Sequence, residues 1–442
     1  MLGVAADIMK VGAPFPHHCV YEWPEGRKVV KTFEMLPWAN PTPTVPYRSP
    51  WMIGQSRNEA ILRQHLEELG VHVELATELV GFEQNRDNVF AHIVKRDGSS
   101  EVRETVQASY LVGADGARSV VRKQLGLAFP GETREKDRLL IADIEVSGLG
   151  REARPTEDSG VFSFLVDGPD LDFQSLIADH QALLNHIRKI TNRNELEFGQ
   201  FNLAWKLALV HKGVSAPSLL ETYDTERLPV ITEMIARSTA ILNQTTSFRP
   251  TERRSRIFHQ LGVNCRWSPV LVDEQPEADS VKTAGPYLDE DPTVLYAGDR
   301  APEAPGLVPL VQDSTSLGEK TATRKAETTS LLNIYGPTHH TIIIFATKSE
   351  EAASLLRAAG EYPAGLVLTV TVLPKDTSPT AAVPEADLAV VDSEGYAHEI
   401  YPPVHKGFRV IVVRPDGVVG AIAKGEDGLK RYFKTIFFNC EC

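Results

Sequence analysis

The chain has 442 residues, which is long enough for two or three domains with cores of their own. Its hydrophobic fraction of 42% and charged fraction of 24% are those of an ordinary globular protein, and a net charge of −13 argues against nucleic acid or an anionic membrane as a partner. No apolar run approaches the ~20 residues of a membrane-spanning helix.

The four cysteines are far apart or close to the C-terminus, and their spacing fits no metal-binding motif: Cys19, Cys265, Cys440 and Cys442. The segment from Met1 to Lys10 is apolar but lacks the basic leader and cleavage site of a signal peptide. We therefore expect a reduced, intracellular compartment and a cytoplasmic protein.

The first clear element is a helix that a capping box at Ser56 and Glu59 predicts. Apolar positions continue along one face of this helix to Leu69, and Gly70 is expected to end it. The next residues, Val71–Leu75, alternate between apolar and polar side chains and predict a half-buried strand.

Two β-like runs, Asn88–Val94 and Glu101–Val112, are joined by Asp97-Gly98, which is a strong hairpin signal. The second run leads into Tyr110–Arg122, a segment that reads as an apolar strand, a glycine-flanked Asp and a helix with two arginines. In α/β proteins, a strand followed by a glycine-rich turn and a helix N-terminus is a place where phosphate-bearing cofactors bind.

The side chains of this turn suit such a ligand. Gly113 and Gly116 would let the backbone approach a cofactor closely. Asp115 offers an acceptor for hydroxyl groups, and Arg118 offers a guanidinium fork for phosphate. The simpler alternative is an ordinary βα turn with an exposed Asp-Gly pair.

The residues Gly113–Arg122 resemble the Asp-Gly fingerprint of class A FAD-dependent aromatic monooxygenases, above all the phenol hydroxylase branch with its fungal aromatic hydroxylases. In that family the fingerprint contacts both FAD and the nicotinamide cofactor, and a glutamine ahead of the helix described above contacts the flavin. The resemblance therefore implies these cofactor-binding residues: Gln55, Gly113, Asp115, Gly116 and Arg118. For Gln55, a polar residue with no function ahead of a helix N-cap is an equal alternative.

Two other fingerprints of the family have no counterpart in this sequence. No Gly-x-Gly-x-x-Gly turn, which seats the FAD pyrophosphate at a helix N-terminus, occurs in the 442 residues. The third, a Gly-Asp segment that binds the ribityl chain, is absent where Phe198–Gln200 runs directly into Phe201–Val210. The latter stretch resembles the helix that follows this fingerprint, and Leu219–Pro229 resembles the next helix and its Pro-initiated successor.

The C-terminal part begins after a Pro- and Asp-rich linker, Glu274–Pro292. Gly298–Pro302, with the sequence Gly-Asp-Arg-Ala-Pro, resembles the opening of the thioredoxin-like domain of phenol hydroxylase relatives, so its Gly-Asp pair is assigned no flavin role. No cysteine lies between Cys265 and Cys440, which excludes dithiol chemistry there. In the family this domain contributes to dimerisation.

The rest of the C-terminal part alternates between strand-like and helix-like runs. Arg414–Gly417 marks a hairpin turn between its last two strands. The predicted strands are Thr341–Phe345, Leu366–Leu373, Leu388–Asp392 and Phe408–Arg414, and the predicted helices are Ser349–Gly360 and Gly425–Phe438.

The sequence thus predicts a mixed α/β and α+β protein. An incomplete, Rossmann-like FAD/NAD(P)-binding domain with its substrate sheet is expected over residues 1–272, a linker over 273–292 and a thioredoxin-like α/β domain over 293–442. Two strand-like runs, Leu139–Val146 and Val161–Val166, belong in the family to the sheet that roofs the substrate pocket.

The resemblance implies an FAD-dependent, NAD(P)H-using monooxygenase that hydroxylates a small phenol-like aromatic substrate, in secondary metabolism of the fungal type, as a homodimer. No catalytic residue and no metal ligand is assigned, because the family's catalytic groups lie in segments that this chain lacks. Two alternatives remain: a cofactor-deficient remnant or pseudoenzyme (an incomplete gene model) acting at most as a dimerising interaction protein, and a thioredoxin-fold interaction module that folds from Tyr296 onward.

Overall fold

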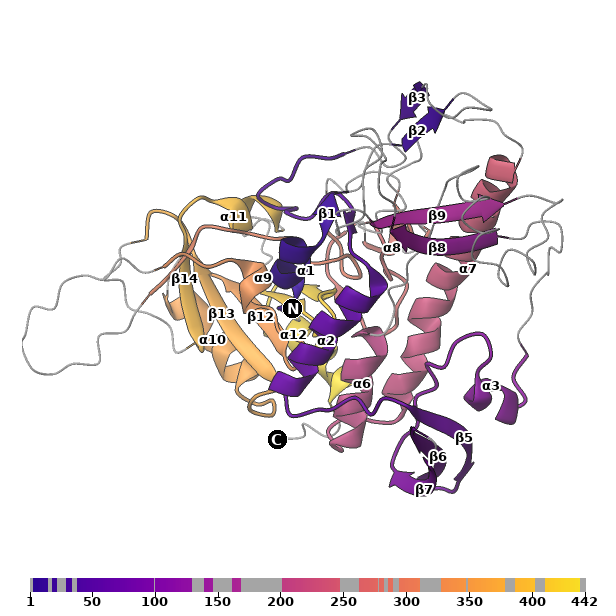
Figure 1. The fold of residues 1–442 in the computed structure, drawn as a ribbon. Coiled ribbons are helices and arrows are strands. Elements are labelled where there is room, and N and C mark those ends of the chain that lie inside the picture. The colour runs from indigo at the N-terminus through magenta and orange to yellow at the C-terminus, as the bar shows by residue number, and fades with distance from the viewer. Residues whose placement is uncertain are drawn as a thin grey trace, which may run out of the picture. The chain divides into compact units, whose positions relative to one another are not determined.

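The computed structural model divides into two compact units, which are described one at a time: unit 1 is Met1–Gly3, Pro14–Trp51 and Glu197–Cys442, and unit 2 is Val4–Ala13 and Met52–Leu196. The chain passes from one unit to the other within the short strands β1 (Ala13–Pro14, labelled in Figure 1) and β4 (Trp51–Met52). The structure describes residues 3–14, 18–21, 29–33, 38–98, 100–128, 139–145, 161–167, 201–246, 262–276, 278–281, 285–288, 294–310, 327–346, 349–377, 386–401 and 410–437.

Unit 1 is built on a seven-stranded sheet with the order β10-β16-β15-β12-β13-β14-β11. The three strands β12, β13 and β14 run parallel, whereas β15 is antiparallel to both of its neighbours. Its strands are β10 (Val272–Asp273), β11 (Leu307–Pro309), β12 (His340–Phe345), β13 (Val367–Leu373), β14 (Leu388–Asp392), β15 (Val410–Val413) and β16 (Val419–Ala423).

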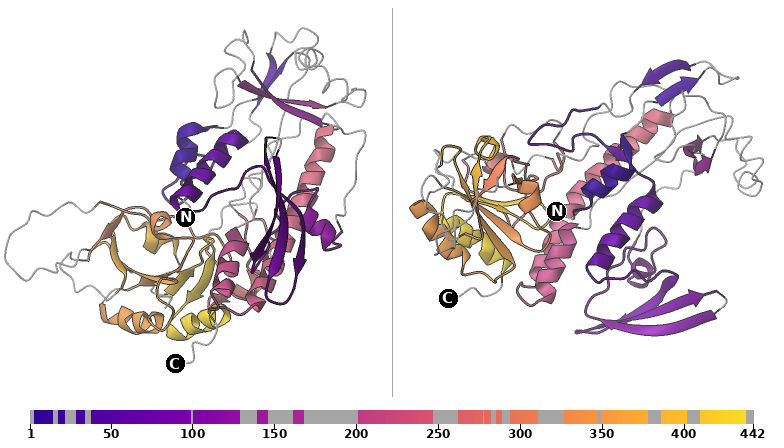
Figure 2. Two further views of the ribbon diagram at one scale, coloured as in Figure 1. Left: turned by 60° about the horizontal axis from the view of Figure 1, so that its bottom comes forward. Right: turned by 60° about the vertical axis from the view of Figure 1, so that its left-hand side comes forward.

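Both faces of this sheet are covered, so the central strands read as continuous apolar runs and every residue of β12 is buried. Ile342 and Ile344 point into a cluster with side chains of α10 and α12, while Ile343 and Phe345 point into the cluster on the other face. Figure 2 shows α10 and α12, the orange and yellow helices, on one side of the sheet. The helices are α8 (Ala278–Val281), α9 (Leu331–Ile334), α10 (Ser349–Ala359), α11 (Tyr396–Ile400) and α12 (Glu426–Ile436).

Two further helices of unit 1 come from earlier in the chain, α6 (Phe201–His211) and α7 (Ser218–Thr246). Trp205 and Leu209 of α6 belong to the same hydrophobic cluster as α10 and α12. The expected pair of helices around Pro229 is wrong, because α7 continues through this proline as one helix of 29 residues. The remaining strands of unit 1, β2 (His18–Tyr21) and β3 (Val29–Phe33), pair antiparallel.

The strands and helices predicted for the C-terminal part are confirmed within one or two residues at their ends. The hairpin turn at Arg414–Gly417 is confirmed as well, since Gly417 has φ +75° and its N–H donates to the Arg414 carbonyl at 2.9 Å. Within the predicted linker, the structure places the end of β10 and the short helix α8.

Unit 2 contains α1 (Ala5–Val11), α2 (Gln55–Glu68), α3 (Val120–Gln124) and a three-stranded sheet of β5 (Thr77–Gln84), β6 (Val89–Asp97) and β7 (Ser100–Ala108). Strands β8 (Leu139–Glu145) and β9 (Val161–Asp167) form a separate antiparallel pair. The β6–β7 hairpin is confirmed, with Asp97 opposite Ser100. The capping box is wrong: the helix begins at Gln55 with Gly54 as its N-cap, and no side chain caps it.

The predicted strand Val71–Leu75 is also wrong. These residues form no strand, and the side chains of Val71, Val73 and Leu75 are 51%, 46% and 69% exposed. The strand expected to run to Val112 ends at Ala108. An alternating sequence becomes a strand only beside another strand, and the described residues of unit 2 provide no neighbour for either stretch.

Among the helices of the described residues, none combines the length and apolar character that crossing a bilayer requires.

Candidate functional site

The Asp-Gly turn of unit 2 is held by the N-terminus of α3. The Asp115 carboxylate accepts hydrogen bonds from the backbone N–H groups of Val120 at 2.6 Å and Val121 at 3.3 Å. A hydrogen bond with the Ser119 side chain, helped by these N–H groups, lowers the pKa of Asp115. The Ser119 hydroxyl in turn accepts the N–H of Arg122 at 2.9 Å, so two side chains cap this helix.

Gly113 is required by the packing of the turn against α3. A Cβ atom at this position would lie 2.8 Å from the Cβ atom of Val121, closer than two such carbons can approach. The helix is also attached to β5, because the Gln124 side chain accepts the N–H of Phe82 at 3.0 Å and donates to its carbonyl. The turn and α3 therefore have a fixed place on the three-stranded sheet.

The outer side of the turn is open. Gly116 has φ +70°, a conformation that favours glycine, and nothing lies within 4 Å of the place where its Cβ would be. Arg118 is exposed, and among the described residues its guanidinium forms no hydrogen bond or ion pair. A backbone that a ligand can approach, beside a cation that no described residue pairs with, fits a phosphate-bearing cofactor. The Asp115 side chain, by contrast, is already hydrogen-bonded to the backbone of α3.

Gln55 is placed elsewhere in the same unit. It is the first residue of α2, it is exposed, and its Nε2 donates to the Glu59 carboxylate at 2.8 Å. Helices α2 and α3 are separate in Figure 1, and the one hydrogen bond described for the Gln55 side chain goes to Glu59. The structure therefore brings together four of the five expected residues but not the fifth.

The Gly-Asp pair of the C-terminal part has a structural role in unit 1. The Asp299 carboxylate binds the Arg266 guanidinium through two hydrogen bonds of 2.7 and 2.8 Å, and it also accepts the N–H of Tyr296 at 3.0 Å. Gly298 has φ +102°, and a Cβ there would lie 2.6 Å from the backbone of Arg266. The protein itself therefore occupies the space on the backbone side of Gly298 and binds the Asp299 carboxylate.

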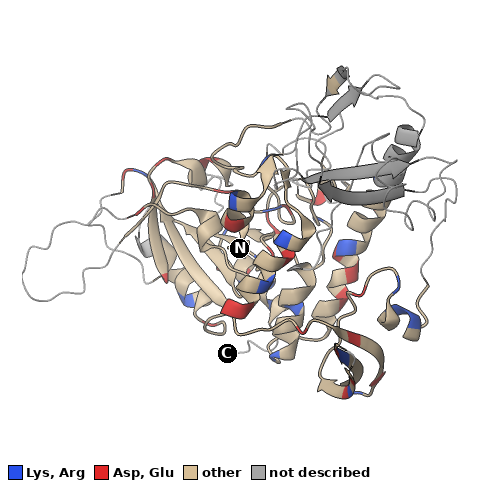
Figure 3. Ribbon diagram, in the orientation of Figure 1, with Lys and Arg blue, Asp and Glu red and all other residues tan. Residues whose placement is uncertain are grey.

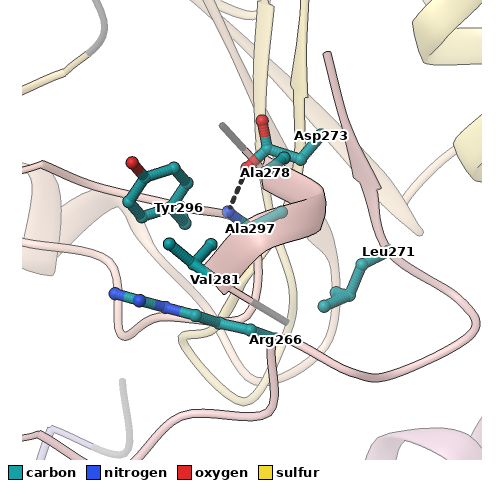
Figure 4. A pocket seen from close by; sticks show the side chains of 7 residues that line it. All are labelled: Arg266, Leu271, Asp273, Ala278, Val281, Tyr296 and Ala297. Atoms are coloured by element: carbon teal, nitrogen blue, oxygen red, sulfur yellow. Dashed lines mark hydrogen bonds between the residues drawn. The ribbon is translucent and has the colours of Figure 1, made fainter. Parts of the chain in front are cut away.

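A small hollow lies beside this pair, with about 10 Å³ of space, which is no more than a single water molecule needs. Tyr296 covers the Arg266 guanidinium, with 4.8 Å between the ring centroid and Cζ, and Asp273 accepts the N–H of Ala297 at 2.8 Å (Figure 4). Burial raises the pKa of Asp273, and its hydrogen bonds from Ala297 and Gln275 oppose that rise. Protein atoms thus already bind both charged groups of the hollow, leaving no free charge for a ligand.

Charges of both signs alternate on the helices. Arginines and acidic residues are interspersed along α2 and α7, as the blue and red segments of Figure 3 show, so neither helix presents a surface of one sign. The group of charges that the sequence did not reveal is buried in unit 1, around Glu226 and Arg414. No single stretch of sequence could have signalled it, because its members come from three distant segments.

Comparison with known proteins identifies the family. A family model described as an FAD binding domain matches residues 2–159 and 199–238. The flavin-dependent monooxygenase of Mycobacteroides abscessus is 30% identical over 365 residues, which cover 69% of this chain and 72% of the relative. The chain belongs to the class A flavin-dependent monooxygenases with this FAD-binding domain. The class inferred from Gly113–Arg122 is therefore confirmed.

Other relatives match over shorter stretches. The 6-methylpretetramide 4-monooxygenase of Streptomyces rimosus is 28% identical over 293 residues, covering 52% of this chain and 50% of the relative. The phenol 2-monooxygenase of a Pseudomonas species is 25% identical over 271 residues, covering 48% and 43%. The chain thus spans about half the length of these two relatives.

The fold is that of solved flavin monooxygenases. The flavin-dependent monooxygenase PieE, solved in complex with FAD and substrate, superposes with a TM-score of 0.68 at 18% identity, covering 98% of this chain and 90% of that one. The family match is interrupted between residues 160 and 198 and resumes at residue 199, next to the place where the third fingerprint was expected. Most of that interval lies outside the described residues.

Proposed function

We propose that this chain is an FAD-dependent, NAD(P)H-using monooxygenase that hydroxylates a phenol-like aromatic substrate in secondary metabolism of the fungal type. The observation that carries the proposal is an open Asp-Gly turn, inside the segment that matches the FAD-binding family, whose Arg118 guanidinium forms no ion pair with any described residue. Relatives named for 6-methylpretetramide, pentachlorophenol and phenol support a phenol-like aromatic substrate.

The chain's own residues would bind and orient the cofactor. Arg118 would bind a phosphate oxygen through its guanidinium fork, and the backbone at Gly116 would pass close to the cofactor. Asp115 would keep the turn in shape through its bonds to α3, and Gln55 would border the flavin ring. When bound, FAD supplies the redox chemistry between NAD(P)H, O₂ and the aromatic ring, while the protein supplies position and water exclusion.

The C-terminal part, residues 293–442, would be a thioredoxin-like domain of the phenol hydroxylase branch, joined by residues 273–292 to the FAD and substrate domain over 1–272. What supports this is the parallel β12–α10–β13 unit beside the antiparallel β15–β16 pair and α12, in the order β16-β15-β12-β13. A cytoplasmic homodimer is the assembly that we propose with it.

The alternative function is a cofactor-deficient remnant that acts as a dimerising interaction protein. It is favoured by the absence of a Gly-x-Gly-x-x-Gly turn from the 442 residues and by the exposed apolar stretch at Val71–Leu75. Each missing phosphate contact at a helix terminus removes part of the affinity for FAD.

A flavin titration of the purified chain separates the two functions. Saturable binding at micromolar FAD or tighter, followed by visible absorption and flavin fluorescence, supports the monooxygenase and leads to NAD(P)H oxidation assays with candidate phenols. An Arg118→Gln variant should then bind FAD about 10- to 100-fold more weakly, because a hydrogen bond to a charged group contributes roughly 1.5–3 kcal/mol.

The matched control is Arg103→Gln on β7, which removes an exposed arginine that pairs with Glu101 at 3.2 Å in the same unit. It should bind FAD as tightly as the unmodified chain. No saturable binding by the unmodified chain would contradict the monooxygenase, and equal affinities of the two variants would contradict the role of Arg118.

A further inference from the structure

Four charged side chains are buried together in unit 1, where α6 and α7 meet the turn after β15. The side chains of Lys206, Glu226 and Arg414 have no exposed surface, and that of Asp416 is 4% exposed. Glu226 binds Lys206 Nζ at 3.0 Å and binds the Arg414 guanidinium through two hydrogen bonds of 2.9 Å each. Arg414 Nε donates to Asp416 at 3.0 Å. We call these four residues the Glu226 cluster.

Neutral donors complete the coordination of both carboxylates. Asn202 Nδ2 donates to Glu226 at 2.6 Å and to Asp416 at 3.1 Å, and Trp205 Nε1 donates to Asp416 at 3.1 Å. The Ser268 hydroxyl donates to Glu226 at 2.6 Å. Two positive and two negative charges therefore balance, and donors from α6 and from the chain before β10 satisfy the carboxylates.

The cluster joins two parts of the chain with different relationships to the FAD-binding family. Lys206 and Glu226, together with the donors Asn202 and Trp205, lie within residues 199–238, the second matched segment. Arg414 and Asp416 lie outside the match, at the end of β15 and in the turn that follows. Ion pairs and hydrogen bonds thus connect α6 and α7, which the family model matches, to the end of β15, which it does not match.

We propose that Arg414 and Asp416 are positioning residues, which fix α6 and α7, and with them residues 199–238 of the FAD-binding domain, in one position on the C-terminal sheet. The part of this inference that concerns FAD rests on the proposed function. The part that concerns the helices rests on the contacts alone.

The physical reason is the difference between apolar and charged contacts. Trp205 and Leu209 pack on the sheet through non-directional contacts, which a small shift of the helix would preserve in large part. Any shift would instead break the two hydrogen bonds between Glu226 and Arg414 and leave both buried charges with fewer partners, Lys206 for Glu226 and Asp416 for Arg414, which is unfavourable. A buried ion cluster adds little net stability but selects one register, and that is the role assigned here.

Hydrogen exchange on the full chain tests the coupling. Arg414→Gln leaves two buried carboxylates and one ammonium, and it should speed amide exchange on the order of 100-fold in both α6–α7 and β15–β16, as expected for a buried pair broken on one side. The control is Glu233→Gln, which breaks a half-buried pair with Arg237 on α7. Unchanged exchange over residues 201–246 in Arg414→Gln would overturn the proposal.

Two further variants keep the test decisive if Arg414→Gln does not fold. Trp205→Phe keeps an aromatic ring but loses one donor to Asp416, and should speed exchange in the same segments to a smaller extent. The double variant Glu226→Gln/Arg414→Gln restores the balance between Lys206 and Asp416. Its loss of unfolding free energy should therefore be smaller than the sum of the losses of the two single variants. Additive losses would contradict the coupling within the Glu226 cluster.

Flavin affinity tests the positioning of the cofactor domain. If the unmodified chain binds FAD, Trp205→Phe and Arg414→Gln should bind it more weakly while Glu233→Gln does not. Faster exchange with unchanged FAD affinity would overturn the positioning role of Arg414 and Asp416. The Glu226 cluster would then contribute to the structure alone. Failure of the unmodified chain to bind FAD would contradict the proposed function, whereas the exchange result would still decide whether the cluster couples the helices to the sheet.

Discussion

The carboxylate of Asp299 faces the guanidinium of Arg266 through two parallel hydrogen bonds of 2.7 and 2.8 Å, although the two residues are 33 positions apart in the chain. Their side chains are 5% and 6% exposed. Asp299 belongs to the Gly298-Asp299 sequence, which resembles a flavin fingerprint by composition. Its partner is a protein cation, so the pair stabilises unit 1 and leaves no carboxylate for a ligand.

An Asp299→Asn variant should lower the free energy of unfolding of unit 1 by about 3–5 kcal/mol, because a neutral amide leaves the buried charge of Arg266 without compensation. Urea denaturation of the two proteins measures this loss. As a control, Glu361→Gln removes an exposed pair with Lys430 and should cost less than ~1 kcal/mol. FAD affinity of the folded variant should be unchanged; a weaker affinity with unchanged stability would contradict the structural role.

A Gly113→Ala variant should displace α3 from the Asp-Gly turn, because its methyl group would lie within 2.8–2.9 Å of two Val121 carbons. Overpacking of this kind costs roughly 1–3 kcal/mol. Faster amide exchange over residues 116–127 would report the displacement. Gly285→Ala, at a glycine with nothing within 4 Å of the added carbon, is the control and should leave exchange unchanged. Normal exchange in Gly113→Ala would show that the turn adapts.

The acid stability of unit 1 should depend on His340. This imidazole is 1% exposed and packs edge-on against the rings of Trp205 and Tyr432. Burial, assisted by the positive charge of Arg414, lowers its pKa from 6.5 to about 3. A depressed pKa means that the unfolded chain takes up a proton before the folded chain does, so stability is lost as the pH falls from 6.5 towards about 3.

The expected loss is about 1.4 kcal/mol per pH unit for this one proton. Urea denaturation at several pH values, with His340→Phe as the comparison, isolates it from other groups such as Asp392, whose pKa is lowered despite burial by its hydrogen bonds with His398. Below pH 6.5 the unmodified chain should lose stability steadily relative to His340→Phe. A difference in unfolding free energy that is independent of pH would exclude His340 as the titrating group.

The thiol of Cys265 should be inert in the folded protein. It is 7% exposed, and burial raises its pKa to about 12, so almost no thiolate forms at neutral pH. In a variant with Cys19, Cys440 and Cys442 changed to serine, a thiol reagent at pH 8 should therefore react only as fast as unit 1 opens. Reaction should become fast in 8 M urea, which is the internal control, and rapid labelling without urea would refute this environment.

Local signals in the sequence were sufficient for several elements of this protein. The β6–β7 hairpin follows from Asp97-Gly98, the turn before β16 follows from Arg414–Gly417, and the flavoprotein class follows from Gly113–Arg122. Each depends on a few adjacent residues, because turn conformation and close backbone approach are set by glycine and its neighbours.

Features that depend on contacts between distant segments could not be predicted from the sequence and were decided by the tertiary structure. Val71–Leu75 has the alternation of a strand but no neighbouring strand among the described residues of unit 2, and Pro229 lies inside α7 instead of beginning a new helix. Glu226 and Arg414 are 188 positions apart, and each alone reads as an ordinary surface charge. Their pairing depends on the folded chain bringing α7 to the end of β15, because burial is a property of the whole fold and no local pattern encodes it.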